Sequence, residues 1–219
     1  SRKNTLHLLM AEHKTNCFKC IKNGACELQA MAREYGIDVP NFKSSHGDVQ
    51  HEPFDAHPFL SYDPGLCIQC QRCISTCAKA TGRHALSLER NGARVYVKVP
   101  FGEGWENSLC ESCGNCAQAC PTGALTIKRR KDYREWEVKK VRTTCPHCAT
   151  GCQMDLYVKD GKIVDVQGAD GPSNHNLLCV KGRSGSFDFV DCDARIRYPL
   201  IKNKETGEFE RATWDEALN

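Results

Sequence analysis

Cysteines dominate the chemistry that this sequence could support. Sixteen of its 219 residues are cysteine, and most stand two or three residues from the next one. Disulfide frameworks spread their cysteines apart to close long loops, whereas cysteines separated by two residues converge on one metal site. The thiolates are therefore expected to be metal ligands, and the compartment is expected to be reducing and cytoplasmic.

Eight of these cysteines form an internal repeat with the spacing Cys-x2-Cys-x2-Cys-x3-Cys. This spacing is that of bacterial two-cluster ferredoxins, in which the fourth cysteine of each run binds the other cluster. The first [4Fe–4S] cluster would use Cys67, Cys70, Cys73 and Cys120, and the second Cys110, Cys113, Cys116 and Cys77. Pro121 follows Cys120 as the pattern expects, while Ala78 stands at the matching position of the first half and removes no ligand. The alternative is structural zinc, which takes its ligands in two separated pairs.

A second group near the N-terminus has only three cysteines, Cys17, Cys20 and Cys26. His13 is the candidate fourth ligand, and His7 is a competitor that is expected on a helix surface. Zinc bound by three cysteines and one histidine is the open alternative. The run Gly24-Ala-Cys-Glu-Leu-Gln29 resembles the histidine-ligated [4Fe–4S] segment of the large iron–sulfur subunit of NADH dehydrogenase, which iron-only hydrogenases and NAD-linked formate dehydrogenases share. Imidazole in place of a thiolate removes a negative charge and raises the reduction potential.

The last group comprises Cys145, Cys148, Cys152 and Cys179. Cys145-Pro-His-Cys-Ala-Thr-Gly-Cys152 and Cys179-Val-Lys-Gly-Arg183 are similar to the N-terminal cluster domain of the molybdopterin (bis-MGD) oxidoreductases. The resemblance implies a fourth [4Fe–4S] cluster, a molybdenum or tungsten bis-MGD centre in a downstream domain, and Lys181 as the electron-transfer residue between the two. A surface lysine in a turn is the alternative for Lys181. His147 is expected at the surface, and Cys192, which is left over, is expected to be a buried free thiol.

The elements that would position these ligands predict an α+β fold of small cluster-binding modules in series. Helices are expected at residues 5–13 and 27–35, and strands at 93–99, 138–143, 153–158 and 163–167, the last two joined by an Asp160-Gly161 hairpin. Residues 37–62, with three prolines, are expected to be a linker or an extended wrap. The expected domains are a histidine-ligated module (1–50), a ferredoxin-like domain (51–137), a molybdopterin-type cluster domain (138–197) and the start of a catalytic domain (198–219).

Charge and hydropathy exclude two classes of partner. Thirty basic residues against 27 acidic ones give a net charge of +3, which is too balanced for a nucleic-acid binder. The basic run Lys128–Lys131 is expected to be a solvated face. No apolar run approaches the roughly 18 residues of a membrane span. The start at Ser1 has no initiator methionine or signal-peptide core, so the chain is expected to begin inside a longer one.

The order of the modules resembles the catalytic subunit of a cytoplasmic formate dehydrogenase. This resemblance implies formate oxidation or CO2 reduction by the full-length chain, with electrons passing to iron–sulfur or flavoprotein subunits that are linked to NAD(P), ferredoxin or a hydrogenase. Family members often carry a [2Fe–2S] domain upstream. One alternative is the large subunit of an NADH dehydrogenase-like complex, which is expected to lack the complete double-ferredoxin repeat. The other is a polyferredoxin that only carries electrons.

Overall fold

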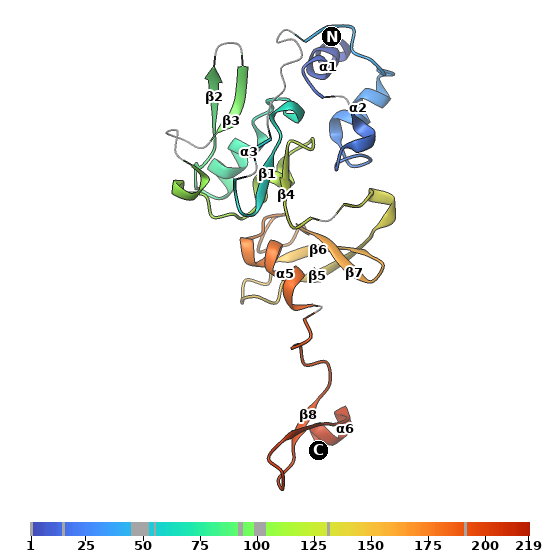
Figure 1. Cartoon of the computed structure of the whole chain (residues 1–219), viewed down its shortest axis with the longest axis vertical. Helices are drawn as coiled ribbons and strands as arrows, with labels where there is room; N and C mark the ends of the chain where they lie inside the picture. Colours follow the sequence, from blue (N-terminus) through green and yellow to red (C-terminus); the bar gives the residue numbers. More distant parts are fainter. Residues whose placement is uncertain are drawn as a thin grey trace. The chain divides into compact units, whose positions relative to one another are not determined.

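The computed structural model describes residues 2–14, 16–44, 53–54, 56–91, 94–98, 104–130, 132–190 and 192–219. The chain separates into two units, Ser1–Ser186 and Phe187–Asn219, and each is described by itself. Helices and small sheets alternate along the first unit (Figure 1). The expected series of modules with mixed helix and sheet content is therefore confirmed, whereas the domain boundaries after residues 50, 137 and 197 stay predictions.

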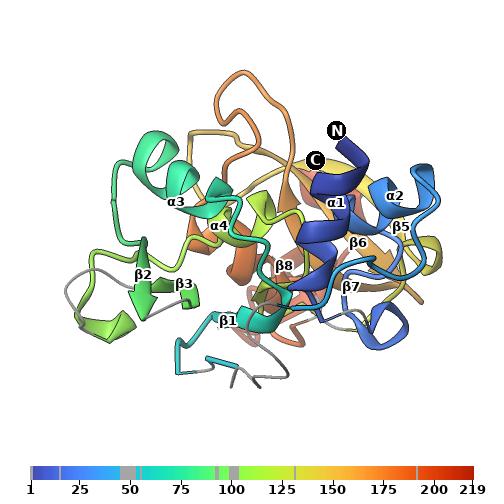
Figure 2. The same cartoon turned by 90° about the horizontal axis from the view of Figure 1, so that it is seen from above.

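Two short helices build the N-terminal module, and Figure 2 shows them close together. Helix α1 spans Arg2–Ala11 and α2 spans Glu27–Glu34. Their apolar faces meet in a core of Leu6, Met10, Leu28, Ala32 and Ile37. Because α1 ends at Ala11, two residues earlier than expected, His13 lies in the turn that follows it, where its N–H bonds the Met10 carbonyl at 3.3 Å.

His7 contradicts the expectation of a surface position, since it is only 4% exposed. Of the two alternatives for residues 37–62, a linker is wrong at the start of the segment, because residues 37–44 fold back over α1 as a wrap would. The Asn41 N–H donates to His7 Nδ1 at 3.2 Å, and the Asn41 side chain lies 3.4 Å from Nε2. Both ring nitrogens of His7 are thus engaged by the protein itself.

The middle module is built around a two-stranded antiparallel sheet. Strand β1 (Leu60–Tyr62) pairs with β4 (Leu125–Ile127), and a hairpin of β2 (Ser87–Asn91) and β3 (Arg94–Lys98) lies beside it. Helices α3 (Arg72–Ser75) and α4 (Asn115–Ala119) pack against each other. The expected linker is therefore wrong at its end too, because buried Leu60 and Tyr62 anchor β1 in the core. Residues 45–52 and 55 of that segment lie outside the described residues.

The internal repeat is visible in the backbone of the two cysteine loops. Gln69 and Ser112, at matching positions, have φ of 56° and 58°, and the next matched pair, Gln71 and Gly114, have φ of 61° and 73°. L-residues rarely adopt this left-handed conformation, so its repetition at equivalent positions shows that both loops wind in the same way. Each loop then enters its short helix with the third cysteine buried.

A three-stranded antiparallel sheet forms the third module. Its order is β5 (Lys139–Thr144), β6 (Gln153–Lys159) and β7 (Lys162–Gly168). The expected hairpin is confirmed, with Asp160 and Gly161 at φ of 50° and 75° between paired Lys159 and Lys162. Tyr133, Tyr157 and Val164 pack together on this sheet.

The second unit is small and open. Helix α5 (Ser186–Phe189) begins at the division between the units; β8 (Leu200–Lys202) and β9 (Phe209–Arg211) form a hairpin, and α6 (Trp214–Leu218) starts with a Thr213–Glu216 capping box. Every residue of the two strands is exposed. The expectation that Cys192 is buried is wrong: its thiol is exposed, since so short a segment builds no core around it. Among the described residues, none of the helices is long and apolar enough to cross a membrane.

Candidate metal centres

The second ferredoxin-type set of ligands surrounds one pocket. Its wall includes all four predicted cysteines of the set, namely Cys77, Cys110, Cys113 and Cys116. Cys77 comes from a π-helical turn at Thr76–Ala80, Cys110 and Cys113 come from the loop that leads into α4, and Cys116 lies in the first turn of α4. Burial raises the pKa of the Cys116 thiol, and the neighbouring cysteines raise it further.

The first ferredoxin-type set is also brought together across the repeat. Burial raises the pKa of Cys73 to about 12, with Cys120, Cys67 and Cys70 as the neighbouring thiols that add to the shift. Burial also raises the pKa of Cys67, and Cys120 and Cys70 add to that shift. The fourth cysteine of each run therefore joins the other run, which is the exchange that the spacing predicts. The charge of Cys73 also raises the pKa of Cys116, so the two sets are neighbours.

The N-terminal set gathers around a second pocket, which His13, Cys17 and Cys26 line together. Burial raises the pKa of Cys26, and Cys20 and Cys17 act in the same direction. Burial lowers the pKa of His13, which favours the neutral imidazole that metals bind. Its Nδ1 is buried and has no hydrogen-bond partner in the part of the chain that the structure describes. An unpaired buried nitrogen beside three thiols favours His13 over His7, whose nitrogens Asn41 occupies.

The fourth set is the most open of the four. Cys145 is buried, Cys152 is partly buried, and Cys148 and Cys179 are exposed. Burial raises the pKa of Cys152, and the other three thiols add to the shift. A hydrogen bond with Thr150 lowers the pKa of Cys148, and the charge of Lys181 lowers it further.

Lys181 and His147 both lie at this fourth set. Lys181 is exposed in the π-helical turn Lys181–Gly185, which follows Cys179. His147 is exposed as expected, and its ring lies beside Gly185. The open side of the set therefore carries one exposed lysine next to two exposed thiols.

These four sets fit iron–sulfur clusters by the chemistry of their donors. Buried thiols with raised pKa values ionise only when a cation compensates the charge, and grouped thiolates repel one another without one. In the part of the chain that the structure describes, no three His, Cys, Asp or Glu side chains converge tightly enough to hold one metal ion. Ligands that surround a pocket suit a four-iron cluster better than a single zinc ion.

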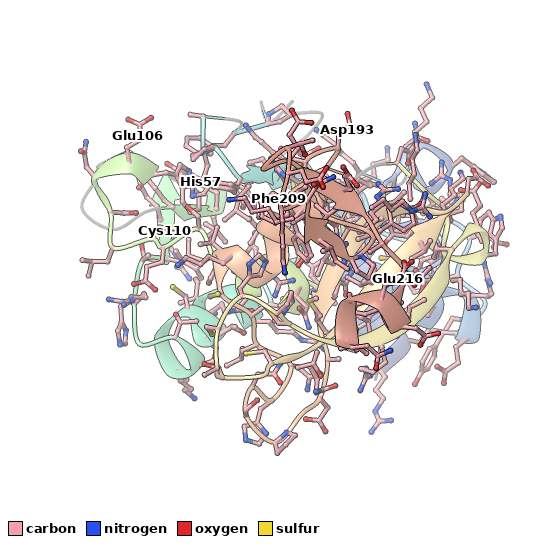
Figure 3. All side chains as sticks on the ribbon, turned by 90° about the horizontal axis from the view of Figure 1, so that it is seen from below. His57, Glu106, Cys110, Asp193, Phe209 and Glu216 are labelled. Atoms are coloured by element: carbon pink, nitrogen blue, oxygen red, sulfur yellow. The ribbon has the colours of Figure 1, made fainter. Side chains whose placement is uncertain are left out.

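His57 is a residue of the candidate site that sequence reasoning missed. Its Nδ1 accepts hydrogen bonds from the Phe59 and Leu60 N–H groups at 3.1 and 3.0 Å, so the ring proton resides on Nε2. Nε2 lies 3.5 Å from the Cys110 sulfur and is positioned to donate to it (Figure 3). Burial lowers the pKa of His57 and keeps the ring neutral, with Lys128 acting in the same direction. Unlike the cysteines, His57 belongs to no spacing motif in the sequence that could have revealed this contact.

The basic run Lys128–Lys131 is solvated only in part: Lys128 and Arg129 are exposed, Lys131 lies outside the described residues, and Arg130 and the nearby Arg134 contact the N-terminal loop. Arg130 donates to the Ile21 carbonyl at 3.0 Å, and Arg134 donates to the carbonyls of Cys20 and Phe18 at 2.7 and 2.9 Å. These arginines fasten the loop that holds Cys17 and Cys20 to the rest of the unit. The loop's carbonyl oxygens act as the acceptors because its tight turns leave them outside regular structure.

Three family models match the chain in succession. The NADH-ubiquinone oxidoreductase-G iron–sulfur binding region matches residues 2–40, the ferredoxin-like domain of NADH-quinone oxidoreductase subunit 3 matches 58–126, and the molybdopterin oxidoreductase Fe4S4 domain matches 138–188. These matches support iron–sulfur cluster-binding modules in series along the chain. Each of the four ligand sets falls within the matched ranges.

Several whole proteins are similar to this chain along its length. It is 34% identical over 221 residues to an NADH-quinone oxidoreductase subunit of Rhizobium meliloti, covering 99% of this chain and 25% of the relative. It is 30% identical to the NADPH-Fe(3+) oxidoreductase subunit alpha of Geobacter sulfurreducens, with 99% and 24% covered. A protein of Staphylococcus haemolyticus, provisionally named a formate dehydrogenase, is 29% identical, with 100% and 26% covered.

A solved structure is similar as well. The NAD+-reducing [NiFe]-hydrogenase in its H2-reduced state matches with a TM-score of 0.50 at 30% identity, over 58% of this chain and 53% of that one. The chain spans about a quarter of the length of the curated relatives named above. Along its length the chain is thus similar to the iron–sulfur region of NADH-quinone oxidoreductases and of proteins named as formate dehydrogenases.

Proposed function

We propose that this portion belongs to the catalytic subunit of a formate dehydrogenase and relays single electrons between a molybdenum or tungsten bis-MGD centre and a partner subunit. Sixteen protein ligands, fifteen cysteines and His13, would hold four [4Fe–4S] clusters, each of which accepts and releases one electron. The observation that carries the proposal is the continuity of the four ligand sets: each set borders the next along the unit.

The first contact in this series joins the N-terminal set, called the His13 set, to the first ferredoxin-type set, called the Cys120 set. The His13 set is His13, Cys17, Cys20 and Cys26, and the Cys120 set is Cys67, Cys70, Cys73 and Cys120. The Glu27 N–H, directly after Cys26, donates to the Pro121 carbonyl, directly after Cys120, at 3.0 Å. A Cβ at Gly123 would lie 3.0 Å from the Cys20 sulfur, so this glycine allows the close approach of the two loops. The loops that carry these two sets are therefore in direct contact at this point.

The last contact joins the second ferredoxin-type set, called the Cys116 set, to the fourth set, called the Cys179 set. The Cys116 set is Cys77, Cys110, Cys113 and Cys116, and the Cys179 set is Cys145, Cys148, Cys152 and Cys179. Asn115, adjacent to Cys116, exchanges two hydrogen bonds of 3.0 Å with the backbone of Leu178, adjacent to Cys179. Beyond this point Cys148, Cys179 and Lys181 are exposed. We place the exchange with the pterin centre on this open side, and the exchange with a partner at the His13 set.

The choice of formate rests on the order of the modules and on the named relatives. A ferredoxin-like domain alone does not separate the candidates, because the NADH-quinone oxidoreductase family model covers residues 58–126 as well. The molybdopterin-type cluster domain and the similarity to the Staphylococcus haemolyticus protein favour formate dehydrogenase. The second candidate, an NADH-quinone oxidoreductase-like subunit, is favoured by the 34% identity with the Rhizobium meliloti protein.

The test is an assay of the full-length polypeptide in its native complex, with formate, NADH and hydrogen as separate donors and a viologen dye or quinone as acceptor. Formate-dependent dye reduction, and CO2 reduction with the reduced dye, are the expected results. Activity with NADH and quinone but none with formate would replace the proposal with the second candidate.

A further inference from the structure

Arg183 is the most deeply buried charged side chain among the described residues, with 1% of its surface exposed. Its Nε donates to the Cys113 carbonyl at 2.8 Å, and one terminal nitrogen donates to Asn115 Oδ1 and Gln118 Oε1, both at 2.8 Å. The other donates to the Val166 carbonyl at 3.4 Å. All four acceptors are uncharged oxygens, so these bonds engage four of the five N–H donors of the guanidinium without neutralising its charge.

A buried cation of this kind costs several kcal/mol unless an anion compensates it. Asp165 is the carboxylate whose charge acts most strongly on Arg183, but it already interacts with other groups. Tyr133 and Gln167 donate to it at 2.9 Å, and Arg130, also buried, lies 4.0 Å away. Two buried arginines against one buried aspartate leave one positive charge in this region.

The cysteine sulfurs of two ligand sets lie around Arg183 and would carry the compensating negative charge when they hold clusters. Its backbone belongs to one set, because its N–H bonds the Cys179 carbonyl at 3.1 Å. The adjacent Gly182 packs against the Cys145 sulfur. The guanidinium lies at the other set, where it contacts Cys113. The sulfurs of Cys113 and Cys116, and that of Cys179 from the first of these sets, interact with its charge. Arg183 thus spans the boundary between the Cys116 and Cys179 sets.

The neighbouring loop is shaped to admit this side chain. A Cβ on Gly114 would lie 2.6 Å from Arg183 Cδ and 2.4 Å from Ile127 Cδ1, closer than real atoms approach. At the matching position of the first repeat stands Gln71, with a similar backbone angle but a full side chain. The left-handed turn therefore tolerates a side chain, and glycine at position 114 is required by the approach of Arg183.

We propose that Arg183 is a positioning residue that links two neighbouring clusters electrostatically: its buried charge favours the reduced form of both the cluster at Cys77, Cys110, Cys113 and Cys116 and the cluster at Cys145, Cys148, Cys152 and Cys179. Each oxidised four-thiolate cluster carries about −2 and becomes more negative on reduction, so a fixed cation between two of them raises both reduction potentials. This inference rests on the proposed function, since it requires the four clusters.

The experiment is a redox titration of the full-length complex, monitored by electron paramagnetic resonance. Arg183→Met and Arg183→Gln remove the charge, Arg183→Lys keeps it, and Arg142→Met is the control. Arg142 is exposed and ion-paired with Asp155, so its loss removes an equal charge from the surface. We expect both neutral variants to lower the equilibrium constant for reducing two of the four clusters by at least tenfold, about 59 mV for one electron. Arg183→Lys and Arg142→Met should change none of the four by more than about threefold, which is roughly half of that 59 mV step.

Each outcome decides the proposal. Four unchanged potentials in a neutral variant that holds its full iron would overturn it. If both neutral variants lose iron while Arg183→Lys retains it, the charge is needed to hold the clusters and the proposal stands. If all three variants lose iron, Arg183 acts only through its shape and hydrogen bonds, and the proposal fails. Iron content of the unaltered protein separates these results from failure of the proposed function, because a protein without four clusters refutes the latter directly.

Discussion

Substituting Asn115 should loosen the contact between the Cys116 and Cys179 sets. Asn115→Ala removes two hydrogen bonds to the Leu178 backbone, each 3.0 Å, and one from Arg183 at 2.8 Å. Asn115 and Leu178 are 5% and 3% exposed, so water cannot easily replace the lost partners. The substitution leaves the buried N–H and carbonyl of Leu178 without their partner.

The expected size of the effect follows from these three bonds. A neutral hydrogen bond contributes about 0.5–1.5 kcal/mol, and a bond to a charged group about 1.5–3 kcal/mol. The sum is about 2.5–6 kcal/mol, and every 1.4 kcal/mol corresponds to a tenfold change in an equilibrium constant. Opening of the backbone at Leu178 should therefore become at least about 60-fold more frequent.

Amide hydrogen exchange of Leu178 in the cluster-containing protein measures this opening directly. Asn203→Ala is the matched control, since Asn203 also makes three hydrogen bonds, to Glu205, Thr206 and Glu210, but at the surface. There water replaces the lost partners, so exchange of the Glu205 amide should rise by less than about tenfold. Equal effects in the two variants, or a Leu178 amide whose protection is unchanged in Asn115→Ala, would refute the reasoning.

Three other substitutions test single residues of the candidate centres. His13→Cys should keep the iron content and lower the potential of one cluster, because a thiolate adds negative charge; an unchanged set of potentials would reject His13 as a ligand. His57→Phe should lower one potential by removing the donor to the Cys110 sulfur, and a potentiometric titration that shows no shift would mean that the contact has no effect. Lys181→Ala should leave all clusters assembled but slow turnover, and normal turnover would leave Lys181 as a surface residue.

The ligand sets could be predicted from the sequence because cysteine spacing is a local property. Two-residue gaps bring three consecutive thiols to three corners of one cluster, and the repeat then pairs Cys77 and Cys120 with the opposite runs. The Asp160-Gly161 hairpin was predictable for the same reason, since its turn type depends on two adjacent residues.

The surroundings of the sets depend on contacts between distant residues, and here the sequence was a poor guide. His57 approaches Cys110, and Arg183 approaches Cys113, across more than fifty residues of chain. His7 is buried because residues around Asn41 return to cover α1, which no periodicity shows. The exposure of Cys192 could not be judged either, because a cysteine's burial depends on the core that its segment can build.

Iron and acid-labile sulfide analysis of the anaerobically isolated chain tests the central claim most directly, with zinc measured in the same sample. Four clusters predict about sixteen iron and sixteen sulfide per polypeptide, with zinc far below one. Zinc at one or more per chain, with iron well below sixteen, would contradict the assignment of all four ligand sets to [4Fe–4S] clusters.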